Sequence, residues 1–239
     1  MKHLYILFSF FFFVHYSFSS SYKLVQDSIK EENKSKNYTI SVEYLKMDGF
    51  KDKSTQDDFN GYVSDLINKS VNDFKKEMIG WVSTLDAQSE FDIGNTIFLQ
   101  DERIVSIRFD GYQYYSGTAH PTTFFFSVNY NLADNEPITF SSLFKGDYLS
   151  KISGLCIKDL IRQEKEYAPE NTDYTAIKDG AGPGDDNFEV FNLMVDTLHI
   201  TFPVYQVASY AEGPKEVDIL YKDIISIIDK KGPLGLLIK

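Results

Sequence analysis

Cysteine is almost absent from this chain, since Cys156 is the only one in 239 residues. A single thiol excludes an internal disulfide, so packed apolar surface has to stabilise the fold. The 20 phenylalanines and 16 tyrosines can supply that surface. Cys156 lies within 149–160, where apolar residues recur with helical spacing and no histidine is close in sequence. We therefore expect a buried structural thiol and not a nucleophile.

Histidine is scarce too, and only His120 and His199 lie beyond the first 19 residues. Two histidines and one thiol in three separate segments match no zinc-ligand spacing. The sequence contains no Gly-x-Ser-x-Gly elbow, no phosphate-binding loop and no dinucleotide fingerprint. The Gly- and Asp-rich segment 171–187 lacks the spaced acids of an EF-hand, which favours an exposed loop over a calcium site. We predict no cofactor, no metal ion and no catalytic residues, and we favour a binding protein over an enzyme.

Positive charge is the third shortage, because 24 Lys and Arg face 35 Asp and Glu and the net charge is −11. Such an acidic chain repels phosphate, so it is predicted to be a poor partner for nucleic acid or anionic lipid. A cationic partner would suit it. The acidity also has a simpler explanation, which is that it keeps a secreted protein soluble.

The one long apolar run, Leu4–Val14, has eleven residues and is shorter than the roughly 20 that span a bilayer. Lys2 precedes the run, and the small residues Ser17 and Ser19 follow it. This pattern predicts a signal peptide over residues 1–19, with an uncleaved anchor as the alternative. We expect a secreted or periplasmic protein without a stable membrane anchor.

The order of elements predicts an α+β fold, in which two long helices and a C-terminal helix pack on a mostly antiparallel sheet. Helices are expected from the capping residues Asp57 and Asp58 to Gly80, from Asp147 to Tyr167, and from Tyr221 to Lys230. Short runs of alternating or aromatic residues predict the strands, which are 38–45, 95–100, 103–115, 124–132, 188–195, 197–202 and 215–221.

The predicted organisation has four parts. Residues 20–37 are polar and are expected to form a flexible lead-in after the signal peptide. A single α+β domain is expected over 38–230, with a subdomain seam near 134–137. Residues 231–239 are expected to form a C-terminal tail.

The most informative segment is 112–121, which is predicted to join two aromatic strands through a turn of small residues. Gly117 permits a tight backbone path, and Pro121 favours an extended conformation at His120. The imidazole of His120 could transfer protons, but we favour a role in satisfying backbone groups at the hairpin end. Alternation places Tyr115 on the face opposite Tyr112 and Tyr114, so one set is expected in the core and the other on a binding surface.

Four motifs together resemble a family of bacterial extracytoplasmic domains. They are Tyr-x-Tyr-x-x-Gly-x-Ala-His-Pro at 112–121, Asn-Tyr-Asn-Leu at 129–132, Ile-Thr-Phe-Ser-Ser-Leu-Phe at 138–144, and Pro-Val-Tyr-Gln-Val-Ala-Ser-Tyr-Ala-Glu-Gly at 203–213. The family includes the ectodomain of the lysozyme-sensing anti-sigma factor RsiV and the accessory domain of peptidoglycan or polysaccharide deacetylases. The resemblance covers about 38–228. In this chain Ser116-Gly117-Thr118 replaces the family's glycine pair.

The resemblance implies a cell-envelope recognition module that binds a cationic, lysozyme-like protein or a peptidoglycan glycan. The deacetylase domain with its metal-binding histidines is absent from the sequence, so that activity is not implied. The alternative is a small envelope hydrolase in which His120 acts as acid and base beside a carboxylate. The candidate binding residues are Tyr112, Tyr114, Tyr115, Gly117, His120, Tyr205 and Tyr210.

Overall fold

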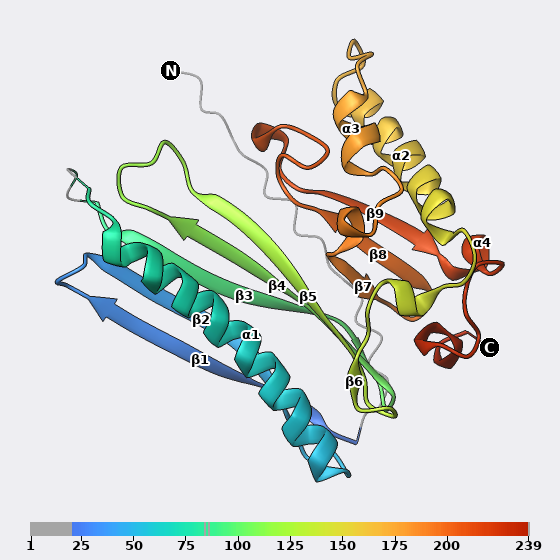
Figure 1. Cartoon of the computed structure of the whole chain (residues 1–239), viewed down its shortest axis with the longest axis horizontal. Helices are drawn as coiled ribbons and strands as arrows, with labels where there is room; N and C mark the ends of the chain where they lie inside the picture. The colour runs from blue at the N-terminus through green and yellow to red at the C-terminus, as the bar shows by residue number, and fades with distance from the viewer. Residues whose placement is uncertain (1–20, 84, 86, 239) are drawn as a thin grey trace, which may run out of the picture.

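A six-stranded sheet forms the N-terminal half of the computed structural model, which describes residues 21–83, 85 and 87–238 (Figure 1). Neighbouring strands run antiparallel except β2 and β3, which pair in parallel because the helix α1 (Lys53–Gly80) connects them. The predicted α+β class is therefore confirmed. The strands of this sheet, in spatial order, are β1 (Lys23–Asn33), β2 (Tyr38–Asp48), β3 (Ser89–Gln100), β4 (Ile104–Tyr114), β5 (Thr122–Asn131) and β6 (Glu136–Pro137). The predicted signal peptide lies outside the described residues.

Helix α1 packs along one face of this sheet (Figure 1). It begins earlier than predicted, because the capping carboxylate belongs to Asp52, which accepts hydrogen bonds from the backbone amides of Ser54 at 3.0 Å and Thr55 at 3.3 Å. Apolar residues at three- and four-residue steps then give the helix one buried face. These buried residues are Phe59, Val63, Ile67, Val71, Phe74 and Met78.

Strand β1 corrects the prediction of a flexible lead-in over 20–37. It pairs with β2 in an unbroken antiparallel register from Lys23↔Asp48 to Asn33↔Tyr38. The strand was missed because most of its side chains are polar and no apolar alternation marks it. It lies at the edge of the sheet, where charged side chains hinder pairing with a further chain.

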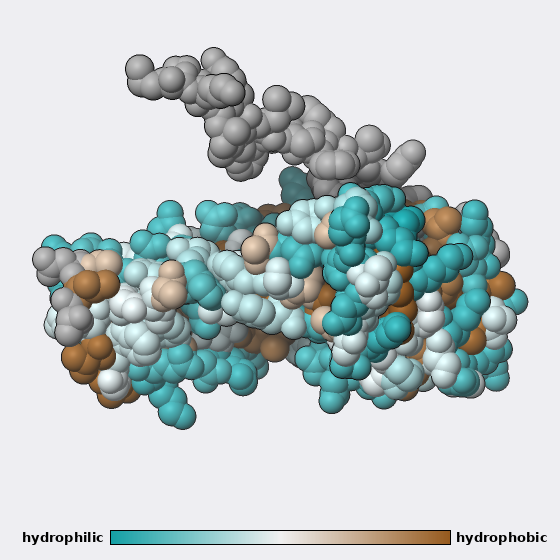
Figure 2. Space-filling view, turned by 90° about the horizontal axis from the view of Figure 1, so that it is seen from above, coloured by the Kyte–Doolittle hydropathy of each residue, from teal (hydrophilic) through white to brown (hydrophobic). Residues whose placement is uncertain are grey.

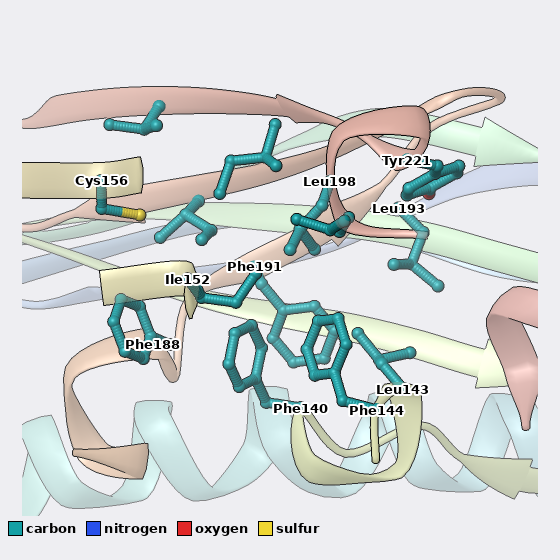
Figure 3. Packing of buried hydrophobic residues seen from close by; sticks show 14 of the residues in the cluster. Phe140, Leu143, Phe144, Ile152, Cys156, Phe188, Phe191, Leu193, Leu198 and Tyr221 are labelled. Atoms are coloured by element: carbon teal, nitrogen blue, oxygen red, sulfur yellow. The ribbon is translucent and has the colours of Figure 1, made fainter. Parts of the chain in front are cut away.

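The C-terminal half contains a three-stranded antiparallel sheet of β7 (Phe191–Leu193), β8 (Thr197–Phe202) and β9 (Lys215–Leu220). Helix α2 (Tyr148–Tyr167) packs on it and begins at Asp147, as predicted. Figure 3 shows the shared core, to which α2 contributes Ile152 and Cys156. Burial and the charge of Asp159 raise the pKa of the Cys156 thiol to about 12. The prediction of a buried structural thiol is confirmed.

Three predictions for this half were wrong. The expected loop 171–187 contains α3 (Thr175–Gly180) and the beginning of a 3-10 turn, η2 (Asp185–Phe188). The expected final helix is only α4 (Tyr221–Ile224). The expected tail instead folds back through η4 (Pro233–Leu236), where Leu234 is fully buried in the core. The structure of these segments depends on burial against residues that are distant in sequence. Such burial leaves no pattern in the local sequence.

The two halves meet across the face of the large sheet that α1 leaves free. Along β4, Val105, Ile107 and Phe109 belong to the core under α1. The intervening side chains point the other way, and Ser106 donates to the Asn129 Oδ1 at 2.7 Å and accepts from the Asn192 Nδ2 at 2.9 Å. Within residues 21–83, 85 and 87–238, no helix is long and apolar enough to cross a bilayer.

The pairing of β4 with β5 confirms the predicted hairpin. Its register runs from Ile104↔Asn131 to Gln113↔Thr122, with Tyr112 opposite Thr123. The loop of this hairpin is therefore the segment 115–121, which carries Gly117 and His120.

Candidate functional site

Two loops that are distant in sequence bring three aromatic side chains together. The rings of His120 and Tyr210 stack with centroids 4.2 Å apart, and those of Tyr210 and Tyr205 lie 5.7 Å apart. The Tyr205 hydroxyl is 3.3 Å from the His120 Nε2. We call His120, Tyr205 and Tyr210 the aromatic patch. The structure thus brings together three of the seven predicted site residues.

The hairpin loop that carries His120 is held from below. Gly117 adopts a φ of 96°, which glycine reaches without strain. The Trp81 Nε1 donates to the backbone carbonyl of Ser116 at 3.0 Å, and the Thr118 amide donates to the Tyr115 carbonyl at 2.9 Å. Gly117 therefore shapes the loop and does not itself join the aromatic patch.

Tyr205 is held in a strained and exposed conformation. Its φ is 70°, which few residues other than glycine adopt, and its side chain is 63% exposed. The next two residues anchor it, because Val207 is buried and the Gln206 Nε2 donates to the carbonyls of Gly180 at 2.8 Å and Asn187 at 3.0 Å. A strained residue that exposes a large ring is more typical of a binding site than of a core.

Tyr210 is positioned by a capped 3-10 turn, η3 (Tyr210–Glu212). The Ser209 side chain accepts from the Glu212 amide, and the Glu212 carboxylate accepts from the Ser209 amide at 3.1 Å, which is a capping box. An ion pair of 3.1 Å between Glu212 and Lys215 ties the turn to β9. The Tyr210 ring is therefore set by local hydrogen bonds and not by burial in the core.

His120 lacks the surroundings of a general base. Its Nδ1 lies 2.8 Å from the Pro121 carbonyl, which can only accept, so Nδ1 carries the proton in this geometry. The Nε2 then accepts from the Tyr205 hydroxyl. Both ring nitrogens are engaged without a carboxylate that would orient and charge the ring. This geometry fits the predicted role at the hairpin end.

The sheet beside the aromatic patch carries carboxylates. Asp92 lies opposite Tyr112, and Glu90 lies opposite Tyr114. Burial and then the charge of Glu90 raise the pKa of Asp92. The pKa of Tyr112 is raised, first by burial and then by Glu90, Asp92, Tyr210 and Tyr114. Tyr112 is therefore close to both the acids and the aromatic patch. The Asp92 carboxylate makes neither a hydrogen bond nor an ion pair with the described residues.

Tyr115 lies apart from the other candidates, on the α1 side of the sheet. Its ring packs 5.5 Å from Phe74 and 4.9 Å from Trp81, and its hydroxyl donates to the Glu77 carboxylate. Burial and then Glu77 raise its pKa. The predicted division of the tyrosines between two faces therefore holds, with Tyr115 on the core side.

A charged network between the two sheets was not among the predicted site residues. Arg108 of β4 donates to Asp110 at 2.8 Å, to Thr201 at 2.9 Å and to Glu216 at 2.6 Å. Its guanidinium also lies between two rings, 5.4 Å from that of Phe98 and 5.3 Å from that of Phe125. The sequence signal for this network was Arg108 itself, because an arginine within a mostly apolar strand requires charged or polar partners.

The same network contains a serine-protease-like order of groups. The Thr201 Oγ1 lies 3.3 Å from the His199 Nε2, and the His199 Nδ1 lies 2.8 Å from Asp218. Thr201 is buried, however, and its hydroxyl accepts a hydrogen bond from Arg108. A nucleophile that no substrate can reach does not support catalysis, so we assign this network to cohesion between the sheets.

The network makes stability depend on pH. Burial opposes charge on His199, but Asp218 and Glu216 outweigh it and raise the pKa above its ordinary 6.5. His199 and, against burial, Arg108 lower the pKa of Glu216 to about 2. His199 therefore stabilises fully below pH 6.5 and loses its effect as the pH rises through its raised pKa. Glu216 stabilises above pH 4.5 and loses its effect towards pH 2.

We expect His199→Gln to remove the part of the unfolding free energy that declines above pH 6.5. Urea unfolding of the wild type and the variant over a pH series measures this difference. His120→Gln is the matched control, because His120 lies in the hairpin loop and outside the network. Parallel curves for the wild type and His199→Gln would contradict the assignment.

Gly180 controls the loop that carries Tyr205. A Cβ at this position would lie 1.9 Å from the Gln206 carbonyl oxygen. Gly180→Ala is therefore expected to displace the loop and to cost about 1–3 kcal/mol of unfolding free energy. Gly154→Ala is the control, because no atom lies within 4 Å of its Cβ position in α2 and alanine favours a helix by about 0.5–1 kcal/mol. Thermal unfolding of both variants checks the contrast, and equal stabilities would refute it.

No cluster of three or more His, Cys, Asp or Glu that could hold a metal ion occurs among the residues that the structure describes.

Two sequence families match successive parts of the chain. The family described as "Deacetylase PdaC" matches residues 31–123, and "Protein of unknown function (DUF3298)" matches residues 141–222. The first match contains most of the large sheet and His120, and the second contains Tyr205 and Tyr210.

The chain is also similar to the peptidoglycan-N-acetylmuramic acid deacetylase PdaC of Bacillus subtilis strain 168. The two are 29% identical over an alignment of 174 residues, which covers 68% of this chain and 35% of the deacetylase. The chain therefore spans about a third of the length of that relative.

Two crystal structures share the fold. A DUF3298 family member from Bacteroides fragilis NCTC 9343 has a TM-score of 0.67 at 18% identity and covers 91% of this chain and 98% of its own. A DUF3298 family protein from Pseudomonas aeruginosa PAO1 has a TM-score of 0.59 at 10% identity and covers 87% and 95%. Together the matches support a PdaC/DUF3298-type family. The likeness to RsiV stays a prediction.

Proposed function

We propose that this protein is an extracytoplasmic recognition module of the cell envelope that binds a cell-wall glycan through the aromatic patch. The observation that carries the proposal is Tyr205, whose exposed ring on a left-handed backbone lies against the Tyr210 ring and whose hydroxyl contacts His120. The apolar face of a pyranose packs on such rings, and the phenol adds a polar group at the edge. The similarity to a peptidoglycan deacetylase supports a glycan and an extracytoplasmic location.

Titration calorimetry with purified peptidoglycan fragments tests the proposal. We expect heat of binding from muropeptides or from the glycan strands, and none from a gluco-oligosaccharide of equal length. The absence of heat with every peptidoglycan fragment would overturn glycan binding.

A second candidate ligand is a cationic protein such as lysozyme. The specific observation in its favour is the pair of carboxylates, Asp92 and Glu90, next to Tyr112 in a chain of net charge −11. Aromatic anchors with acids at the rim suit a basic surface, and such association is faster at low ionic strength. Calorimetry with lysozyme at low and moderate salt tests this ligand. If no heat is released at either salt concentration, lysozyme is excluded.

The variant His120→Ala distinguishes the recognition module from the alternative, a small envelope hydrolase. A recognition module should lose only part of its affinity, because His120 supports the stack without a carboxylate partner. A hydrolase should lose turnover of peptidoglycan fragments completely. Turnover by the wild type that disappears in His120→Ala would replace the binding proposal.

A further inference from the structure

The end of the molecule where α1 finishes exposes an unusual amount of apolar surface. Ile79 is 72% exposed and Val82 is 88% exposed, and the neighbouring Trp81 and Leu85 are exposed as well. We call these four residues the apolar tip. Figure 2 shows hydrophobic surface at the left-hand end of the molecule, which is the end where α1 finishes and β1 turns into β2 in Figure 1.

The apolar tip is rigidly supported at its centre. The Trp81 indole Nε1 donates to the Ser116 carbonyl at 3.0 Å, and the ring packs 4.9 Å from that of Tyr115. The indole is thus fixed against the β4–β5 hairpin while Ile79 and Val82 on either side face solvent. These contacts hold Trp81 in place, and the side chains of Ile79 and Val82 remain exposed beside it.

A positively charged hollow adjoins the apolar tip. It has a volume of about 360 Å³, and its lining includes Lys36, Lys75, Lys76 and Ile79. The Lys36 Nζ lies 3.4 Å from the Ile79 carbonyl oxygen, which joins the hollow to the tip. Lys75 pairs with Glu31, whereas Lys36 and Lys76 form no ion pair with the described residues.

This local charge differs from the charge of the whole chain. The nearby Glu77 carboxylate accepts a hydrogen bond from the Tyr115 hydroxyl and forms no ion pair with Lys36 or Lys76 among the described residues. A net charge of −11 predicts poor affinity for anionic lipid, but that value averages over the molecule. The lysines that matter for a surface contact gather at the end that is also apolar.

We propose that the apolar tip and the lysine hollow form a peripheral docking site for an anionic phospholipid bilayer. Ile79 and Val82 would enter the boundary between headgroups and acyl chains, and Trp81 would lie at headgroup level, which tryptophan prefers. Lys36 and Lys76 would meet lipid phosphates with their stems along the apolar surface. The contact is reversible and differs from a spanning anchor.

Docking in this way would also orient the aromatic patch. Ser116, which accepts the hydrogen bond from Trp81, belongs to the hairpin loop that carries His120. The aromatic patch would then face the space next to the membrane. The membrane contact itself does not depend on any glycan.

The chain offers a direct optical test, because Trp81 is its only tryptophan. We expect vesicles of phosphatidylglycerol and phosphatidylcholine to shift its emission to shorter wavelength, and brominated acyl chains to quench it. Vesicles of phosphatidylcholine alone should cause much smaller changes, and added salt should weaken the effect of the mixed vesicles. No emission change with the anionic vesicles would overturn the proposal.

Co-sedimentation with the same vesicles compares the wild type with variants of the proposed site. Ile79→Asp with Val82→Asp is expected to lower the bound fraction at least tenfold, and Lys36→Glu with Lys76→Glu is expected to remove the preference for anionic lipid. The control is Val195→Asp with Ile225→Asp, two apolar residues of the C-terminal half that are similarly on the surface. Equal binding of tip and control variants would refute the site. A tip variant that instead converts a dimer into a monomer would show that a second copy covers the tip.

Discussion

Tyr205→Asn is expected to lower the affinity for a peptidoglycan fragment about 30-fold, a loss of about 2 kcal/mol. Asparagine tolerates a positive φ, so this change removes the ring and keeps the backbone of the loop. The loss follows from the position of the ring, which is exposed and lies 5.7 Å from that of Tyr210, with its hydroxyl within reach of His120. Calorimetric titration of wild type and variant with the same fragment measures the ratio.

Tyr167→Asn is the matched control for this prediction. Tyr167 is 64% exposed, against 63% for Tyr205, but it lies at the end of α2 and outside the aromatic patch. Its removal should leave the affinity unchanged. Tyr205→Phe should lose little, because the ring remains and only the contact of the hydroxyl with His120 disappears. Equal losses for the asparagine variants at 205 and 167 would show that the patch does not anchor the ligand.

Arg108→Met is expected to lower the free energy of unfolding by about 3–5 kcal/mol. The guanidinium is only 13% exposed and joins β4 to residues of both β8 and β9. Methionine fills part of the volume between the two phenylalanine rings but leaves Asp110 without its cation and Glu216 with His199 alone. Urea unfolding at neutral pH measures the loss from the midpoint and slope.

Two comparisons make this result specific. Arg162→Met removes an exposed arginine whose partners, Asp159 and Glu166, lie on the same helix, and it should leave the midpoint unchanged. Glu216→Gln added to Arg108→Met should recover part of the stability, because it removes a carboxylate that has lost the nearer of its two partners. A loss at Arg108 no larger than that at Arg162 would mean that the network does not hold the sheets together.

Much of the fold was predictable because its elements carry local signals. The apolar steps from Phe59 to Met78 define α1, and Asp147 caps α2 as expected. β1 carried no such signal, since its stability comes from eleven paired residues with β2 and not from an apolar face of its own. The turn at η4 carried no such signal either, because Leu234 is buried in a core that is built mostly from distant segments of the chain.

The candidate site was predictable in its residue types but not in its arrangement. Tyr205, Tyr210 and His120 each stood in a distinctive motif, yet only the folded chain shows that the two loops meet. The acids Asp92 and Glu90 were missed because an acidic chain offers many carboxylates and the register of β3 against β4 alone selects these two. Tyr115 stood among the candidates because alternation separates the two faces without saying which one is covered.

The position of Leu99 and Ile104 constrains how this protein can be divided or inherited. Both belong to strands of the N-terminal sheet, yet both are buried in the core of the C-terminal half. The matches to two families fall on either side of 124–140, yet the core around the second matched segment includes Leu99 and Ile104 from the first. A recombination event at that junction would exchange motifs but break a shared interior. A substitution at Leu99 or Ile104 would likewise disturb a core whose other buried members lie more than thirty positions further along the chain.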